Sequence, residues 1–315
     1  LLRETALLLG VGLALIPAFK MKFWNLGGNG QVLVGALAAI ACMINLGGIV
    51  PDILLYLIML VTSIIAGAAW AVIPAIFKAY FNTNETLFTL MMNYIAVGIV
   101  SIFISMWDRT GSHSLGRIDK GHLPVIINNS GLAVLVVALL TAAMWIYLKY
   151  SKHGYELAVV GESENTARYI GLNVKTVIMR TMVLSGAICG VIGLLLAGSI
   201  SHTLSENTAK NMGFTSIIVA WLAKFNPLMM ILTAFFVAFL TKGMGQVQTA
   251  FGISNSSVCD IVVGLMFFFV IGCEFFVSYK MIFKKKVKKK EKKSIKKDVE
   301  KAVATNTSGG EGGNE

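Results

Sequence analysis

Long uninterrupted apolar runs constrain this chain more than any other feature of its sequence. A helix that crosses a membrane needs about 20 predominantly apolar residues, within a range near 17–25. The long candidates are residues 53–78, 85–107, 131–149, 180–201, 227–245 and 258–283, and shorter runs lie at 5–19, 32–49 and 213–225. The pattern predicts an all-α, polytopic membrane bundle of about eight to ten transmembrane helices, including short or interrupted ones.

The composition excludes a water-soluble domain. The 315 residues are 56% hydrophobic and 14% charged, whereas soluble domains are roughly 45–50% apolar and about 25% charged. A soluble fold could not hide this excess, because much of any soluble surface must face water. The four cysteines (42, 189, 259 and 273) form no CxxC pair, which favours small buried hydrophobes over metal ligands or disulfides.

The positive charge is concentrated at the C-terminus. Residues 280–315 hold twelve lysines and five acidic residues, and so carry +7 of the net charge of +11. This excess therefore gives no reason to expect a nucleic-acid partner. We expect residues 1–283 to form the membrane domain and residues 284–315 to form a disordered basic tail, since its composition cannot bury a core. Its lysines would attract anionic membrane lipid.

Lysine and arginine in the short loops predict the orientation. Basic residues crowd the connection at about 150–179 and the C-terminal tail, so both are expected on the cytoplasmic side. The chain begins at Leu1 without a methionine, and its first apolar run lacks a signal-peptide layout. We therefore expect an N-terminal segment, another span, to precede it.

Catalytic and metal-binding motifs are missing from the sequence. It contains no GxxxxGK[ST] phosphate loop, HExxH or GxSxG motif, and all four histidines lie outside the apolar runs. An enzyme therefore has weak support, and no catalytic or metal-binding residue is predicted. Two acidic residues, Asp260 and Glu274, lie in the last apolar run. Either an interfacial position or a role in a transport pathway would account for them.

A glycine-rich run at residues 27–31, GGNGQ, is the most suggestive feature. Three glycines within four residues are expected to break a helix, which a membrane tolerates only where protein or water receives the exposed backbone groups. Interrupted helices of this kind bind solutes in transporters. The alternative is a tight cytoplasmic turn between two short spans, which spacing alone slightly favours. Asn93, inside an apolar run, could bond to another helix or to a solute.

A short helix is predicted inside the basic connection. Ser163 can cap its N-terminus, and Gly171 can end it in the left-handed conformation. Between them, Ala167 and Ile170 are expected to share one face while Arg168 points elsewhere. A two-turn helix is marginal alone, so it should pack either on its own bundle or on a cytoplasmic partner.

Four stretches of the chain resemble the motifs of one family. Residues 25–31, NLGGNGQ, look like N-[IL]-G-x-E-G-Q, and residues 66–96 resemble the family's middle signature. Residues 161–171 resemble the G-x-N-x-x-A-A-x-x-x-G segment that docks on an ATPase, and residues 213–227 resemble its late signature. The family comprises permease subunits of ABC importers for branched-chain amino acids, simple sugars and nucleosides. The nucleoside-type permeases are the most similar. Asn29 departs from the usual glutamate, and residues 162–166 depart from the usual docking pattern.

The resemblance implies a subunit in a bacterial cytoplasmic membrane that makes no covalent change to its solute. Its implied partners are a second permease subunit, related or identical, a separate ATPase that holds ATP and Mg, and an extracytoplasmic solute-binding protein. No cofactor is expected in this chain. The candidate substrate-pathway residues are Asn25, Gly27, Gly28, Asn29, Gly30, Gln31 and Asn93. The candidate ATPase-coupling residues are Ser163, Glu164, Ala167, Arg168, Ile170 and Gly171.

Alternatives remain open for the solute and for the mechanism. Within the family, a sugar or branched-chain amino acid permease is the second interpretation. In a different class, a proton-coupled secondary transporter would need no ATPase but should place acids such as Asp260 or Glu274 on its path. A scaffold without transport activity would not require a glycine-rich interrupted helix.

Overall fold

The computed structural model describes residues 1–108, 114–124, 131–252, 261–269 and 272. Residues Leu1–Phe267 form one compact unit, whereas residues from Phe268 onward belong to a second unit. The helices of the first unit are α1 (Leu2–Lys20), α2 (Gly28–Leu46), α3 (Asp52–Phe81), α4 (Glu85–Trp107), α5 (Gly131–Tyr150), α6 (Lys152–Glu162), α7 (Glu164–Tyr169), α8 (Val174–Leu195), a π-helical turn η1 (Leu196–Ser201), α9 (Met212–Leu222) and α10 (Pro227–Ala250).

The structure confirms the all-helical membrane class. In the described part of the chain, seven helices are long and apolar enough to cross a membrane: α1, α2, α3, α4, α5, α8 with η1, and α10. The apolar α9 is shorter, with 11 residues. The predicted short runs 5–19 and 32–49 belong to two complete helices of 19 residues each, α1 and α2. They are not halves of one interrupted span, because each helix is by itself long and apolar enough to cross a membrane.

Part of the prediction lies outside the described residues. The apolar run 258–283 is described only at residues 261–269 and 272, and the acids Asp260 and Glu274 fall in its undescribed portions. The basic tail 284–315 also lies outside the described residues. These parts of the sequence analysis therefore stay predictions.

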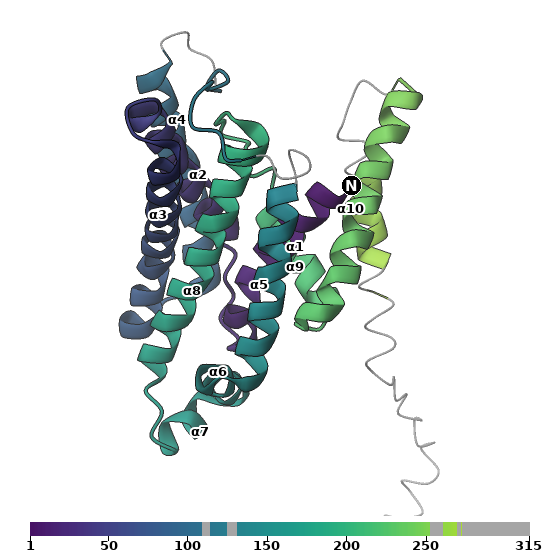
Figure 1. The fold of residues 1–315 in the computed structure, drawn as a ribbon. Helices are drawn as coiled ribbons and strands as arrows, with labels where there is room; N and C mark the ends of the chain where they lie inside the picture. The colour runs from purple at the N-terminus through teal and green to yellow at the C-terminus, as the bar shows by residue number, and fades with distance from the viewer. Residues whose placement is uncertain (109–113, 125–130, 253–260, 270–271, 273–315) are drawn as a thin grey trace, which may run out of the picture. The chain divides into compact units, whose positions relative to one another are not determined.

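The helices divide into an inner and an outer set (Figure 1). Most of the apolar window is buried in α1 (83%), in α2 (61%) and in α8 with η1 (72%), whereas in each of α3, α4, α5 and α10 at most 33% is buried. The outer helices expose large apolar side chains such as Ile53, Leu139 and Leu232. In a membrane protein such faces lie against lipid, which is as apolar as the side chains themselves.

Glycines allow the backbones of the central helices to touch. A Cβ placed on Gly190 of α8 would lie 2.1 Å from the carbonyl oxygen of Ser63 in α3. A Cβ on Gly193 of α8 would lie 2.3 Å from the carbonyl oxygen of Val32 in α2. The Ser63 hydroxyl donates a 3.0 Å hydrogen bond to the carbonyl of Gly35 and so joins α3 to α2. Small residues at helix crossings are typical of membrane bundles, where close packing drives association.

The Gly190 contact generates a test of this packing. Gly190→Ala should force α8 away from α3 and destabilise the bundle by about 1–3 kcal/mol, as overpacked cores generally do. Gly98→Ala on α4 is the matched control, because in the described part of the chain nothing lies within 4 Å of a Cβ at that exposed position. Thermal unfolding of the purified protein in detergent should show a lower midpoint for Gly190→Ala alone. Equal midpoints for the two variants would contradict the close packing.

Candidate functional site

A non-helical connection joins α1 to α2, and its odd-numbered residues are buried whereas Lys22 and Trp24 are exposed. At residues 21–27, here called the α1–α2 connection, the chain leaves α1 and turns sharply, with Lys22 in the left-handed region at φ +57°. The Phe23 N–H donates to the carbonyl of Ala18 at 2.9 Å and fixes this turn. Met21, Phe23 and Asn25 are all buried. The connection therefore runs inside the protein before α2 begins at Gly28 (Figure 1).

The glycine-rich run does not break a helix, so that prediction is wrong. Gly27 is the N-cap of α2, and residues 28–31 form its first turn. The helical geometry is broken just before this run, between Lys20 and Gly28. The glycines lie at the start of α2, where glycine is tolerated. Residues 27–31 are all buried, and the turn that joins the two short spans lies directly before them, at residues 21–26. The glycines serve close packing instead: a Cβ on Gly30 would lie 3.0 Å from Asn93 Oδ1 and 3.2 Å from Ala96 Cβ.

Asn93 of α4 holds the end of the connection. Its Nδ2 donates to the Leu26 carbonyl and its Oδ1 accepts from the Gly30 N–H, both at 2.8 Å. The neighbouring Thr89 hydroxyl accepts from the Leu26 N–H at 3.1 Å. Buried backbone groups outside regular structure need such partners. Of the two roles that the sequence left open for Asn93, the structure shows a bond between elements of the protein itself.

The side chain of Asn25, in the middle of the α1–α2 connection, forms hydrogen bonds to three other residues. Its Oδ1 accepts from the Gly27 N–H at 3.0 Å and from Gln31 Nε2 at 3.4 Å, and its Nδ2 donates to Ser185 Oγ of α8 at 3.3 Å. Gln31 Oε1, in contrast, is buried and has no hydrogen-bond partner within the described residues. This acceptor could receive a hydrogen bond from a donor on a bound molecule.

Asn29 joins the starts of two helices. Its Oδ1 accepts from the Gly213 N–H at 3.1 Å, and its Nδ2 donates to Asn211 Oδ1 at 3.4 Å. α9 begins at Met212, so the N-termini of α2 and α9 meet at this amide. The partial positive charges of both helix ends favour an acceptor oxygen between them. The four amide side chains of Asn25, Asn29, Gln31 and Asn93 are called the amide cluster below.

The short helix α7 forms where the sequence predicts it. Ser163 Oγ accepts from the Thr166 N–H at 3.2 Å and caps the helix. At the other end Gly171 has φ +85°. Its N–H donates to the Arg168 carbonyl at 3.0 Å, and the Leu172 N–H donates to the Ala167 carbonyl at 2.9 Å. This pair of bonds is a Schellman ending, which needs a residue that accepts the left-handed conformation.

The predicted face of α7 is wrong. Ala167 is fully buried in an apolar cluster with Met21, Val160 and Ile178, whereas Ile170 is 53% exposed. The two side chains do not share a face, because α7 ends at Tyr169 and Ile170 is its C-cap. The outward position belongs to Tyr169, which is 93% exposed. Sequence reasoning missed Tyr169, although an aromatic residue beside Ile170 at the end of a capped helix was a usable signal.

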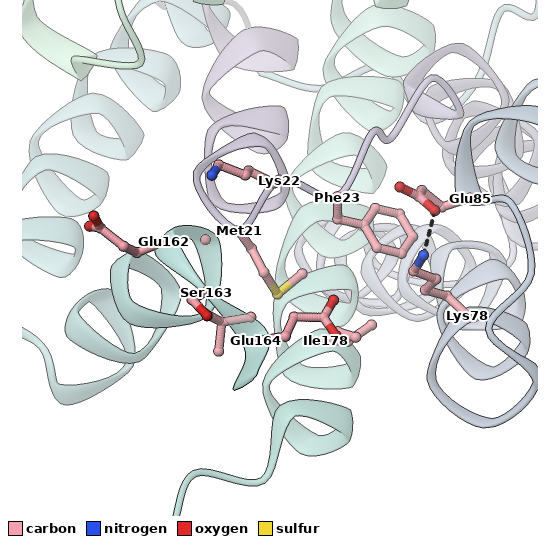
Figure 2. A pocket seen from close by; sticks show the side chains of 11 residues that line it. Met21, Lys22, Phe23, Lys78, Glu85, Glu162, Ser163, Glu164 and Ile178 are labelled. Carbon is pink, nitrogen blue, oxygen red and sulfur yellow. Dashed lines mark ion pairs between the residues drawn. The ribbon is translucent and has the colours of Figure 1, made fainter. Parts of the chain in front are cut away.

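A cavity of about 240 Å³ lies beside the start of α7 (Figure 2). Met21 and Phe23 of the connection line it together with Ser163. Lys78 and Glu85, which form an ion pair with an N–O distance of 2.8 Å, also line it. At the same place α6 rests directly on the end of α1. A Cβ on Gly161 would lie 2.0 Å from the carbonyl oxygen of Lys20.

The fold and these sites define a polytopic membrane protein that has a buried amide cluster and a short capped helix at one end of the bundle. The family model for the permease component of branched-chain amino acid transport systems matches residues 2–271. The chain therefore belongs to this family of transport-system permeases.

Individual relatives span most of the chain. It is 33% identical to the guanosine ABC transporter permease protein NupP of Bacillus subtilis, over 82% of this chain and 76% of the relative. It is 29% identical to the glucose ABC transporter permease protein TsgB13 of Haloferax volcanii, over 89% and 77%. It is 26% identical to the nucleoside ABC transporter permease protein NupB of Lactococcus lactis, over 82% and 75%. No solved structure matches the chain at a significant level.

The burial of Ala167 changes what a charge at that position should do. Ala167→Glu would bury an unpaired carboxylate inside the protein's own apolar cluster, at a cost of several kcal/mol. We expect the purified permease alone to lose thermal stability. Tyr169→Glu, on the exposed side of the same helix, should change the free energy of unfolding by no more than about 0.5 kcal/mol and so leave the midpoint near that of the parent. An unchanged midpoint for Ala167→Glu would show that this face of α7 is not packed on the bundle.

Proposed function

We propose that this chain is the permease subunit of an ATP-binding cassette importer that moves nucleosides across a bacterial cytoplasmic membrane. The observation that carries the proposal is family membership over residues 2–271, together with the guanosine and nucleoside permeases among its relatives. A sugar is the second candidate solute, because a glucose permease is 29% identical. The chain binds and conducts the solute without changing it covalently.

The proposed orientation places α6 and α7 in the cytoplasm. Lys149, Lys152 and Lys175 surround these helices in the sequence, and basic residues mark cytoplasmic loops. The opposite end of the bundle would then face the solute-binding protein. The tail from residue 284 would be cytoplasmic by the same rule.

We propose that the separate ATPase docks on α7. Tyr169 and Ile170 project outward there, and an aromatic side chain beside an aliphatic one is a typical anchor of a protein interface. The cap at Ser163 and the ending at Gly171 make this short helix a defined shape before the partner binds. ATP and Mg belong to the ATPase. A second permease subunit, related or identical, is the remaining membrane partner.

Transport would proceed by alternating access. ATP binding and hydrolysis in the partner would shift α7, and the bundle would open first to one side and then to the other. In the described conformation most groups of the amide cluster bond to one another or to the backbone, which supports a role in shaping the path. Gln31 Oε1 is the acceptor that remains for a solute hydroxyl or amine.

A proton-coupled mechanism has less support. Such a transporter needs acids on its path, and the carboxylate of Glu4 in α1 is ion-paired to Lys242 of α10 at 3.4 Å. The buried centre between α2 and α9 carries amides, which do not titrate. An ATP-driven mechanism fits this neutral centre.

The dependence on ATP can be measured directly. Uptake of labelled guanosine is followed in cells that express this permease with its partners, once with the intact ATPase and once with its Walker lysine replaced. Because the chain has no phosphate loop, uptake should fall to background with the inactive ATPase. Undiminished uptake would contradict the proposal. Competition by unlabelled nucleoside, but not by glucose or leucine, would identify the solute class.

The docking surface gives a second prediction. Replacing both Tyr169 and Ile170 by alanine should weaken ATPase binding by roughly 30-fold, since an interface anchor contributes about 2 kcal/mol or more. Tyr155→Ala is the control, because Tyr155 is 64% exposed on the neighbouring α6. Co-purification of the ATPase with the membrane subunit is the readout. Equal recovery from the double variant and the control would place the docking surface elsewhere.

A further inference from the structure

The α1–α2 connection touches the coupling region at its first residues. Gly161, which precedes α7 by three residues, packs against the Lys20 carbonyl so closely that no Cβ would fit. Met21 and Phe23 belong to the same buried apolar cluster as Ala167 of α7. A displacement of α7 that is carried by α6 would therefore press on the start of the connection at Gly161, because close-packed contacts transmit strain.

The last residues of the same connection are bound to the amide cluster. Asn93 clamps the Leu26 carbonyl and the Gly30 N–H, each at 2.8 Å, and Thr89 receives the Leu26 N–H. Asn25 bonds to Ser185 of α8. One short segment thus has its first residues in the apolar cluster that also holds Ala167 of α7, and its last residues at the point where α2 begins.

The connection is also stiff. The Asn25 N–H donates to the Phe23 carbonyl and the Gly27 N–H donates to Asn25 Oδ1, both at 3.0 Å. These bonds lie within the segment and restrict its dihedral angles, while the Lys22 turn fixes its direction. α8 also packs on α7 through Val174 and Ile178. Both α8 and the connection therefore lead away from α7. Only the connection leads to the first turn of α2, where the N-termini of α2 and α9 meet.

We propose that the α1–α2 connection transmits the displacement of α7 to the first turn of α2 and thereby opens and closes the solute path. Gly161 and Asn93 are the positioning residues at its two ends. The inference rests on the proposed ATP-driven import. It predicts that loosening either end separates ATP hydrolysis from solute movement while the complex still assembles.

The experiment measures guanosine transported per ATP hydrolysed, with the complete complex in proteoliposomes. Asn93→Ala removes both clamping hydrogen bonds, and Gly161→Ala wedges α6 from α1. For each, the amount of guanosine transported per ATP hydrolysed should fall at least tenfold below the parental value. Asn45→Ala and Gly98→Ala are the controls, since Asn45 donates to the Ala41 carbonyl of its own helix and no described atom lies within 4 Å of a Cβ on Gly98. Both controls should keep the parental ratio.

Thr89→Val is a milder variant that keeps the inference testable if Gly161→Ala or Asn93→Ala fails to assemble. It preserves shape and removes only the hydroxyl that receives the Leu26 N–H. Its transport-to-hydrolysis ratio should fall in the same direction by a smaller factor. A parental ratio, or uptake and hydrolysis that fall in parallel, would overturn the inference. An unmodified complex without ATP-driven uptake would instead contradict the proposed function on which the inference rests.

Discussion

A bilayer offers no water to unpaired backbone groups, and the interior of this bundle is organised around that constraint. The α1–α2 connection leaves helical geometry inside the protein, so its N–H and C=O groups need partners from other helices. Asn93 and Thr89 of α4 supply them at Leu26, and Asn25 supplies one at Gly27. Without these side chains the break would cost several kcal/mol for each unpaired group. Because α4 provides backbone partners and Ser185 of α8 accepts a hydrogen bond from the Asn25 side chain, the break also joins those helices to the start of α2.

The packing of the centre follows from the same region. α1, α2 and α8 are the most buried helices of the described bundle, and their contacts use small residues. Gly190 and Gly193 bring α8 against α3 and α2 with no room for a side chain. Close backbone contact leaves few alternative arrangements, because packed interiors switch between discrete states and do not deform smoothly. A displacement that starts at α7 can then reach the starts of α2 and α9, because the packed helices between them do not absorb it by deforming.

Much of this architecture could be predicted from the sequence, because span length and capping are local properties. The apolar runs, the Ser163 cap and the Gly171 ending all depend on neighbouring residues. The prediction of a helix break at residues 27–31 was wrong, because glycine can either break a helix or allow two helices to pack closely. Only the tertiary contacts of Gly30 show that it does the second here. For Ala167, the sequence left open whether it packs on its own bundle or on a partner, and the tertiary contacts show that it packs on the bundle. Six residues of helix do not show which side faces α1, and Tyr169 is outward only because Ala167 packs inward.

The central claim is that a partner ATPase acts on this bundle through α7. A photo-crosslinking amino acid at Tyr169 tests it most directly in intact membranes, with the same probe at exposed Tyr94 of α4 as the comparison. The account predicts that light joins position 169 to the ATPase, that ATP changes the yield, and that position 94 gives no such product. An ATPase crosslink absent at position 169, or equal at the two positions, would contradict it.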